Sequence, residues 1–364
     1  MKIVCLVIND LSHDQRMIRC CSTLAAAGHD VVLVGRELPT SPQLTARPFR
    51  QHRIRCRYHV GKRFYAEFNW RLYRTIHQWE YEVICAVDLD TLLAATLLRR
   101  RGVALVYDAH EWFSETPEVA SRPIVRAAWR SLGRMLVPRT DARYTVGPML
   151  AQRLAQDYGA GFETVRNVPH RLVSSFSENV RGVILYQGML NPGRGLKTAI
   201  QAMASLPDCR LWVVGDGPEK SRLADFAREL GVGDRVVFHG FIAPESLPAI
   251  TRRAWLGINL LEASSASYYY SLANKSLDYV QAGLPSVQMD FPEYRAVNEA
   301  YDTFLLLPRL HPPALVAMIR DLLDEPERYE RLRRNCRRAA EDLCWEREAP
   351  KLLAIYAGLA VGDR

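Results

Sequence analysis

Short apolar runs alternate with segments of helical periodicity along the first half of the chain. The apolar runs predict buried strands at residues 2–8, 31–34, 83–86, 104–107 and 142–146. The helical pattern, with apolar residues recurring every three or four positions, covers residues 16–27, 91–101 and 123–136. Strands that alternate with helices form parallel sheets with helices on both faces, so the pattern predicts a doubly wound α/β domain.

The same alternation begins again in the second half. Strands are predicted at residues 183–186, 210–214, 236–239, 256–260 and 286–289, and helices at 196–204, 219–230, 246–253 and 274–282. Between the halves, residues 167–169 and the polar stretch 174–179 predict a linker. We therefore expect two Rossmann-like domains, residues 1–170 and 171–345, facing a central cleft. The helical segment 346–364 is expected to pack back on the first domain.

The composition fits this organisation. A chain of 364 residues with 48% hydrophobic residues has room for two globular cores. No run reaches the roughly 18 apolar residues of a membrane span, and the apolar start is followed at once by Asn9 and Asp10. The eight cysteines form no CxxC pair or zinc-type spacing, which predicts reduced core thiols in a cytoplasmic protein and no metal site.

Positive charge is concentrated in the first half. Residues 1–170 hold 24 Lys and Arg against 16 Asp and Glu, whereas residues 171–364 hold 24 of each. This asymmetry predicts that the first domain faces an anionic acceptor or surface. Basic and aromatic residues mingle at 57–58, 62–65 and 70–74, as in helices at a membrane interface, although a solvated helix fits equally well. No nucleic-acid-binding motif accompanies the charge, so nucleic acid is not expected as a partner.

Two glycine-rich turns in the second half have the composition of phosphate-binding turns. Gly188 follows a predicted strand, and Arg194 precedes the next helix. Glycine lets the backbone approach a ligand, the helix N-terminus offers N–H groups, and an arginine adds a charge-assisted hydrogen bond. The second turn contains Gly215, Asp216 and Gly217. A purely structural turn is an equally good interpretation of the first motif taken alone.

Lys275 and Asp278 are three residues apart at the start of a predicted helix, so they share one face. The helix dipole disfavours a cation there, so Lys275 indicates that an anion binds nearby. Asp278 is suited to accept hydrogen bonds from a ribose diol, and an ordinary surface ion pair is the alternative. The turn at residues 9–14 contains no glycine, which argues against an N-terminal NAD-binding domain.

Taken together, these segments resemble the donor-binding half of the glycosyltransferase family four group, which are retaining GT-B enzymes. The second-half motifs are 188–195, 213–219, Phe-His-Gly-Phe at 238–241 and Asn-Lys-Ser-Leu-Asp-Tyr at 274–279 followed by Ala-Gly-Leu-Pro at 282–285. The first half resembles the same enzymes at 14–17, 27–31, Tyr-Asp-Ala-His-Glu at 107–111, 145–147 and 165–169. The resemblance implies an α/β GT-B fold of two Rossmann-like domains.

The resemblance also implies roles for individual residues. Arg194 matches the cation that holds the donor diphosphate, Lys275 is a second phosphate cation, and His110 matches the histidine near the reacting sugar carbon. The remaining implied donor contacts are Gly188, Gly215, Asp216, Gly217, Phe241, Tyr270, Asn274 and Asp278, and the acceptor-side residues are Asp14, Arg16 and Glu111.

The sequence departs from the family at two of these positions. The family places a glutamate eight residues before the ribose-binding acid, where this chain has Tyr270, and it has a glutamate where this chain has Asp278. A subgroup with Ser-Leu-x-Asn-Lys before the helix shares the first change. Because Tyr270 is not acidic, a catalytically degenerate protein stays among the alternatives.

The function expected from these observations is sugar transfer from a nucleotide-diphosphate sugar to a glycan or lipid-linked glycan. We expect retention of configuration and no metal or other cofactor, because two cations and helix N–H groups stabilise the leaving diphosphate. The protein is expected in the cytoplasm, peripherally at the inner face of the membrane. Three alternatives remain at this point: a nucleotide-sugar epimerase, a catalytically degenerate GT-B binding protein, and a nucleic-acid-binding protein.

Overall fold

The computed structural model describes residues 1–12, 14–172 and 179–360 and divides into two compact units. Unit 1 comprises Met1–Asn167 and the C-terminal segment from Glu348, and unit 2 comprises Val168–Arg347. The division falls slightly before the predicted boundary at residues 170/171. Most of the predicted polar linker, residues 174–178, lies outside the described residues.

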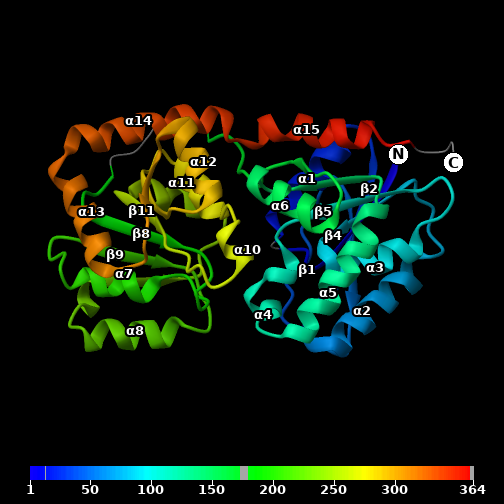
Figure 1. The fold of residues 1–364 in the computed structure, drawn as a ribbon, viewed down its shortest axis with the longest axis horizontal. Helices are drawn as coiled ribbons and strands as arrows, with labels where there is room; N and C mark the ends of the chain where they lie inside the picture. The colour runs from blue at the N-terminus through cyan, green and yellow to red at the C-terminus, as the bar shows by residue number, and fades with distance from the viewer. Residues whose placement is uncertain (13, 173–178, 361–364) are drawn as a thin grey trace. The chain divides into compact units, whose positions relative to one another are not determined.

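Unit 1 is built on a parallel sheet with the strand order β3-β2-β1-β4-β5-β6-β7. Its strands are β1 (Lys2–Asp10), β2 (Asp30–Glu37), β3 (Arg50–Arg55), β4 (Val83–Val87), β5 (Ala104–Ala109), β6 (Ala142–Thr145) and β7 (Glu163–Thr164). Its helices are α1 (Gln15–Ala26), α2 (Gly61–Ile76), α3 (Asp88–Leu98), α4 (Pro117–Ala120), α5 (Pro123–Leu136), α6 (Pro148–Tyr158) and most of α15 (Trp345–Ala357). In Figure 1, α1 lies on one face of this sheet, and α2, α3 and α5 lie on the other.

Central strands of unit 1 are apolar on both faces because helices cover both. Every residue of β4 is buried, and Ile3 of β1 pairs with Val31 of β2 on one side and with Val83 of β4 on the other. Asp14 begins α1 as its N-cap, since its carboxylate accepts a hydrogen bond from the backbone N–H of Met17 at 3.0 Å. The sheet therefore delivers the carboxyl ends of β1, β4 and β5 to one edge, where the polar residues lie.

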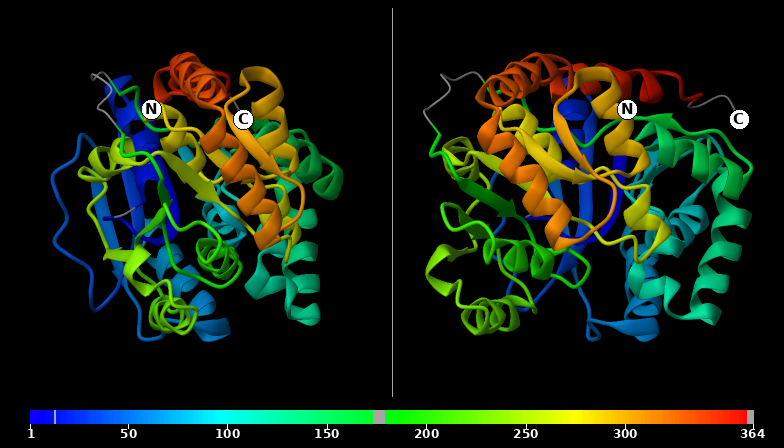
Figure 2. Two further views of the ribbon diagram at one scale, coloured as in Figure 1. Left: turned by 90° about the vertical axis from the view of Figure 1, so that its left-hand side faces the viewer. Right: turned by 60° about the vertical axis from the view of Figure 1, so that its left-hand side comes forward.

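Unit 2 repeats the architecture with the strand order β10-β9-β8-β11-β12-β13. Its strands are β8 (Val183–Gln187), β9 (Arg210–Val214), β10 (Val236–Gly240), β11 (Leu256–Asn259), β12 (Ser286–Met289) and β13 (Phe304–Leu307). Its helices are α7 (Leu196–Met203), α8 (Lys220–Glu229), α9 (Leu247–Arg253), α10 (Ala266–Tyr269), α11 (Asn274–Gln281), α12 (Pro292–Tyr301), α13 (Pro312–Asp324) and α14 (Pro326–Asp342). The two turned views in Figure 2 show helices on both faces of this sheet.

Both sheets are parallel, and all the predicted strands are present within a few residues of their expected ends. The sequence did not predict β3, β7 or β13, and it predicted α3 to start at residue 91 rather than at Asp88. All eight cysteines are buried and free. In the part of the chain that the structure describes, no helix is long and apolar enough to cross a bilayer.

Candidate active site

The strand order creates a topological switch point in each unit, which is where open α/β sheets bind ligands. In unit 2, β8 lies between β9 and β11, and the chain leaves these strands toward helices on opposite faces. Gly188 follows β8 directly, and Lys275 lies in the first turn of α11, the helix between β11 and β12. The sheet thus brings together two residues that are far apart in the sequence.

Arg194 and Lys275 are two cations, each resting on a tyrosine ring. The guanidinium carbon of Arg194 lies 4.9 Å from the centre of the Tyr268 ring, and Lys275 Nζ lies 3.7 Å from the centre of the Tyr186 ring. Among the described residues, neither cation forms an ion pair, and Arg194 Nε has no hydrogen-bond partner. Two neighbouring cations without a salt bridge to a described carboxylate form a site with an affinity for anions.

The electrostatics of Lys275 support this interpretation. Burial and the positive charge of Arg194 hold the pKa of Lys275 well below its ordinary value, although Asp278 acts in the opposite direction. The protein therefore holds a lysine where its charge is disfavoured until an anion arrives. Among the described side chains, none caps α11 at Ala273, so the helix N-terminus also favours negative charge here.

Glycines keep the backbone close to the two cations. A Cβ atom at Gly188 would lie 3.3 Å from Lys275 Nζ, and one at Gly215 would lie only 2.0 Å from the carbonyl oxygen of Gly188. Both glycines have a φ angle of 130°, which side chains disfavour. The two predicted glycine-rich turns therefore pack against each other, and the hydrogen bond from Leu190 N to the Asp216 carbonyl at 2.9 Å joins them.

Asp278 lies on the same side of α11 and is held by a chain of hydrogen bonds. Gln187 Nε2 donates to Asp278 Oδ2 at 3.0 Å, and Thr251 Oγ1 donates to Gln187 Oε1 at 2.8 Å. Gln187, the last residue of β8, thus fixes the orientation of the Asp278 carboxylate. Sequence reasoning missed Gln187, Tyr186 and Tyr268, although two of them end a buried strand next to the predicted glycine turn.

Other predicted donor-side residues lie on neighbouring loops. Asp216 accepts from its own turn, at Gly217 N, and pairs with Lys220 at 3.1 Å. Phe241 follows β10 with 67% of its surface exposed. Tyr270 ends α10, with its ring edge-on to Tyr269 at 5.1 Å.

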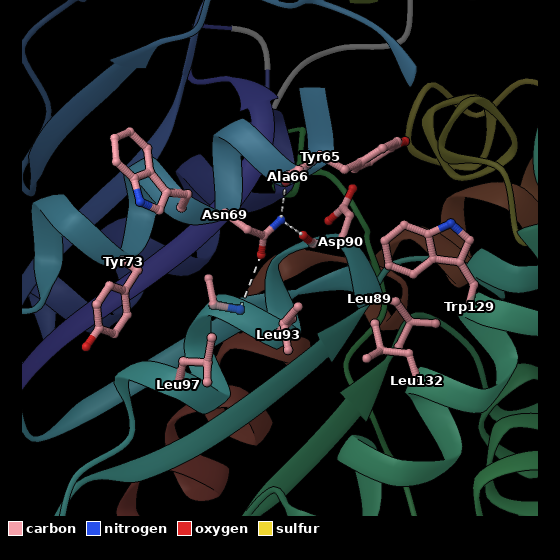
Figure 3. A pocket seen from close by; sticks show the side chains of 12 residues that line it. Tyr65, Ala66, Asn69, Tyr73, Leu89, Asp90, Leu93, Leu97, Trp129 and Leu132 are labelled. Atoms are coloured by element: carbon pink, nitrogen blue, oxygen red, sulfur yellow. Dashed lines mark hydrogen bonds between the residues drawn. The ribbon is translucent and has the colours of Figure 1, made fainter. Parts of the chain in front are cut away.

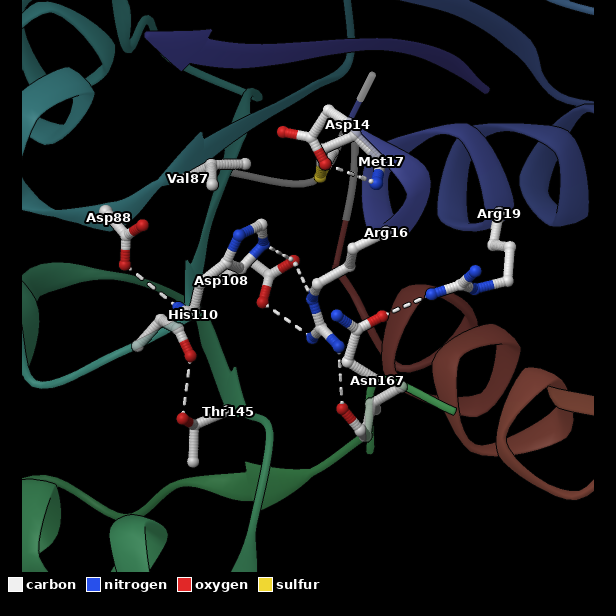
Figure 4. Close-up of polar contacts among 12 residues, drawn as sticks. Asp14, Arg16, Met17, Arg19, Val87, Asp88, Asp108, His110, Thr145 and Asn167 are labelled. Carbon is white, nitrogen blue, oxygen red and sulfur yellow. Dashed lines mark hydrogen bonds and ion pairs between the residues drawn. The ribbon is translucent and has the colours of Figure 1, made fainter. Parts of the chain in front are cut away.

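Unit 1 carries a second polar cluster at its own switch point, between β1 and β4. Asp108 at the end of β5 is fully buried, and Figure 4 shows it between Arg16 of α1 and His110. Arg16 donates to both carboxylate oxygens at 2.8 and 3.2 Å, and also to the Val165 carbonyl at 2.9 Å. Arg16 is only 3% exposed, so it acts on the site through Asp108 and does not reach solvent.

His110 is the member of this cluster that faces open space. Its Nε2 lies 3.1 Å from Asp108 Oδ2, and its backbone N–H donates to Asp88 Oδ1 at 2.9 Å. Burial opposes the charged imidazole, but the Asp108 carboxylate outweighs it and raises the pKa of His110 to about 9. Burial raises the pKa of Asp88 to about 6. His110 is therefore an imidazolium at neutral pH.

A cavity of about 270 Å³ opens beside His110. Asn9 of β1, Asp88 and Asp90 at the start of α3, and Glu111 line it together with His110. Asp14, the third predicted acceptor-side residue, caps α1 and also accepts from Asn9 Nδ2 at 3.1 Å. Within the described residues, no group of three or more His, Cys, Asp or Glu side chains is arranged to hold a metal ion.

Two protein-family models divide the chain between them. The model described as Glycosyltransferase Family 4 matches residues 15–170, and the model described as Glycosyl transferases group 1 matches residues 174–339. The chain belongs to glycosyltransferase family four. The resemblance inferred from the motifs is thereby confirmed.

Curated relatives of this family-four glycosyltransferase match parts of it. The α-D-kanosaminyltransferase of Streptomyces kanamyceticus is 27% identical over 188 residues, which are 50% of this chain and 44% of that protein. The lipopolysaccharide core biosynthesis glycosyltransferase LpsE of Rhizobium meliloti is 41% identical over 59 residues, 16% of this chain and 17% of LpsE. The match thus spans less than half the length of either relative.

Solved structures confirm the GT-B fold of this glycosyltransferase. The sucrose-phosphate synthase of Thermosynechococcus elongatus superposes with a TM-score of 0.81 at 20% identity, covering 98% of both chains. HepE of Anabaena, solved in complex with UDP, gives a TM-score of 0.75 at 16% identity, covering 99% of this chain and 100% of HepE.

Proposed function

We propose that this chain transfers a sugar from a nucleotide-diphosphate sugar to a glycan or lipid-linked glycan acceptor, with retention of configuration. Unit 2 binds the donor and unit 1 the acceptor. The single observation that carries the proposal is the pair of neighbouring cations, Arg194 and Lys275, neither of which forms a salt bridge among the described residues. A diphosphate supplies the missing negative charge.

The cations act on the leaving group. Breaking the bond between the sugar and the nucleotide diphosphate builds negative charge on the leaving phosphate oxygen. Arg194, Lys275 and the N-terminus of α11 are fixed before the reaction, so they stabilise this charge without reorganising. Because protein cations neutralise the diphosphate, we propose a reaction that needs no divalent ion.

On the acceptor side, His110 orients the donor sugar. In a retaining transfer the acceptor hydroxyl attacks the face from which the diphosphate departs. The departing phosphate oxygen takes the proton of that hydroxyl, so no separate base is required. The charged imidazole of His110, held by Asp108, donates a hydrogen bond to the sugar or to the developing negative charge. Asp278, oriented by Gln187, accepts from the ribose hydroxyls.

A thermal-shift experiment with nucleotides tests the donor site. HepE is a structural neighbour whose complexes contain UDP and UDP-glucose, so UDP and GDP are compared first. A nucleotide at a hundred times its Kd should stabilise the protein by about 2.7 kcal/mol. Arg194→Ala and Lys275→Ala should abolish the shift. Lys220→Ala, whose lysine already pairs with Asp216, is the matched control and should retain it.

If both variants bind the nucleotide as tightly as the wild type, the diphosphate site is assigned to the wrong residues. A second candidate function has one observation in its favour. Tyr270 stands where the family has an acid, and this favours a degenerate GT-B protein that binds a nucleotide sugar without transferring it. Donor binding by calorimetry, combined with no turnover and no release of free sugar with any acceptor extract, would support that function.

A further inference from the structure

An apolar groove lies on the face of unit 1 formed by α2, α3 and α5. It encloses about 470 Å³, within the range of roughly 300–1,000 Å³ usual for small-ligand sites. Its walls are mainly aromatic and aliphatic, and we call it the aromatic groove, defined by Tyr65, Trp70, Tyr73, Leu93, Leu97 and Trp129. Figure 3 shows how Tyr65 and Tyr73 of α2, Leu93 and Leu97 of α3 and Trp129 of α5 lie around it.

The walls of the aromatic groove are mostly hydrocarbon, and their polar groups are the Asn69 amide, the Asp90 carboxyl group, two tyrosine hydroxyls and two indole N–H groups. Asn69 is the amide in its lining, and its hydrogen-bonding groups are already used. Its Nδ2 donates to the carbonyl oxygens of Tyr65 at 3.0 Å and Asp90 at 2.7 Å, and its Oδ1 accepts from Ala94 N at 3.2 Å. A sugar requires several hydrogen-bond partners at its hydroxyls, so these walls suit a hydrocarbon better than a glycan.

The aromatic groove and the cavity beside His110 adjoin at Asp90, because this residue lines both. Its side chain is 4% exposed, and in the described part of the chain its Oδ1 has no hydrogen-bond partner. Figure 3 shows the Asp90 carboxyl group directed toward the space beside the Tyr65 and Trp129 rings. A molecule that reaches from the groove to His110 therefore passes a buried carboxyl group with one oxygen, Oδ1, that accepts no hydrogen bond from the described residues.

Apolar side chains at the groove are exposed to an unusual degree for a protein surface. Leu97 is 63% exposed, Trp70 53% and Leu93 41%. On α5, which contributes Trp129 to the groove, Ile124 and Met135 are also exposed, and only Gly133 and Leu136 of the helix are buried. An apolar patch of this kind marks a binding surface for an apolar partner.

Cations border the same surface. Arg74 lies over the Trp70 ring at 5.0 Å, and Lys62 and Arg63 precede the groove residues at the start of α2. Among the described residues, these three cations form no ion pair. Together with the positive excess of residues 1–170, they complement a negatively charged head group.

We propose that the aromatic groove holds the hydrocarbon chain of a phosphate-containing lipid-linked acceptor, whose reactive end extends past Asp90 to His110. The proposal rests on the proposed function and specifies its acceptor. The hydrocarbon packs against the aromatic and leucine side chains, and the phosphate group lies near Lys62 and Arg63 at the start of α2. A glycan without a lipid lacks the part that this groove binds.

Calorimetry with monomeric dodecyl phosphate tests the groove directly. We expect one saturable site per chain, and at least tenfold weaker binding to the double variant Leu93→Gln/Leu97→Gln. Both leucines are substantially exposed and glutamine is a good helix former, so α3 should remain intact. Leu230→Gln, at a leucine of unit 2 that is 39% exposed, is the matched control and should bind like the wild type.

Three results would overturn the proposal. The first is equal affinity of the double variant and the wild type for dodecyl phosphate. The second is equal affinity of the wild type for dodecyl phosphate and inorganic phosphate, since the chain would then contribute nothing. The third is a dimer in sedimentation experiments that dissociates in the double variant, because a second copy would then occupy the groove.

The same samples separate this proposal from the proposed function. UDP should shift the melting temperature of the double variant as it does that of the wild type, because the leucines belong to unit 1 and the cations Arg194 and Lys275 to unit 2. Loss of dodecyl phosphate binding with an intact UDP shift confirms that the groove acts on its own. Absence of a UDP shift in the wild type contradicts the donor site without affecting the groove.

Discussion

Each unit places an arginine close to the switch point of its sheet, and the two arginines differ in how their charge is balanced. In unit 1, Arg16 is buried against Asp108, which accepts two of its hydrogen bonds. In unit 2, Arg194 lies over a tyrosine ring beside Lys275, and no described carboxylate forms a salt bridge with either cation.

The difference shows two uses of a cation: Arg16 stabilises the fold, whereas Arg194 and Lys275 are placed where an anionic ligand can bind. A buried arginine with a carboxylate raises its own pKa and lowers that of its partner, as Arg16 and Asp108 do. The environment of Lys275 does the reverse, because burial and a like charge lower its pKa. The first arrangement is complete without a ligand, whereas the second is stabilised only when an anion binds.

The largest effect is expected on the stability of unit 1. Arg16→Met removes the cation that donates to both oxygens of the buried Asp108 carboxylate and leaves only His110 to pair with it, so it should lower the free energy of unfolding by about 3–5 kcal/mol. Urea unfolding followed by circular dichroism measures the change. Arg50→Met, which breaks an exposed pair with Asp30, should cost at most about 1 kcal/mol. Equal costs for both would remove the distinction between the two kinds of charge.

The next effect is expected on catalysis. Lys275→Met removes one of the two groups that stabilise the leaving diphosphate and should raise the barrier by about 3–4 kcal/mol, a loss of roughly a hundred- to a thousandfold in kcat. Steady-state kinetics with a nucleotide-sugar donor measure the loss. Lys220→Met is the matched control, because that lysine already pairs with Asp216. A kcat within threefold of the wild type would show that Lys275 does not meet the leaving group.

The third effect depends on pH and concerns His110. Its folded-state pKa of about 9 lies above the ordinary value near 6.5, so protonated His110 stabilises the folded state at pH 6 and loses this effect as the pH rises through 9. The shift corresponds to about 3 kcal/mol. His110→Gln should therefore destabilise the protein strongly at pH 6 and hardly at pH 10.

Urea unfolding of the wild type and His110→Gln at the two pH values measures this difference. His59→Gln, at an exposed histidine of the same unit, is the matched control for the substitution itself. A cost of His110→Gln that is the same at pH 6 and pH 10 would mean that Asp108 does not hold an imidazolium.

The smallest effect is expected on the melting temperature when Lys275 is replaced. A lysine whose folded-state pKa is lowered costs stability at neutral pH, so Lys275→Met should leave the melting temperature unchanged or raise it, by the equivalent of about 1 kcal/mol at most. Differential scanning fluorimetry without nucleotide measures it. A clear destabilisation would indicate that Lys275 serves the fold, as Arg16 does.

The elements that the sequence predicted well are those with strong end signals. Helix α5 runs from Pro123 to Leu136 as predicted, because proline at a first turn fixes the start. Strand β3 was missed because Arg50–Arg55 is an edge strand in which only Ile54 is buried, so it shows no apolar run. Helix α2 begins at Gly61 without a side-chain cap. The sequence indicated its mixture of basic and aromatic residues but gave no bounds for the helix.

The candidate site also has features that the sequence predicts and features that it does not. Glycines at φ angles that other residues disfavour, such as Gly188 and Gly215, can be predicted from the sequence, because the backbone conformation requires that residue type. Contacts between side chains of distant elements cannot be predicted in this way. The contact of Lys275 with Tyr186 and that of Arg194 with Tyr268 depend on rotamers across the sheet, and the burial of Arg16 depends on a carboxylate 92 residues away.

The buried cysteines have a practical consequence for experiments with reporter groups. All eight thiols are shielded from solvent, and burial raises the pKa of Cys20 to about 12, so little reactive thiolate is present at neutral pH. A single cysteine introduced at an exposed position, such as Leu97→Cys at the rim of the aromatic groove, should therefore react with maleimide dyes while the native thiols stay silent. Site-specific labelling of this protein should therefore not require that its native cysteines be replaced first.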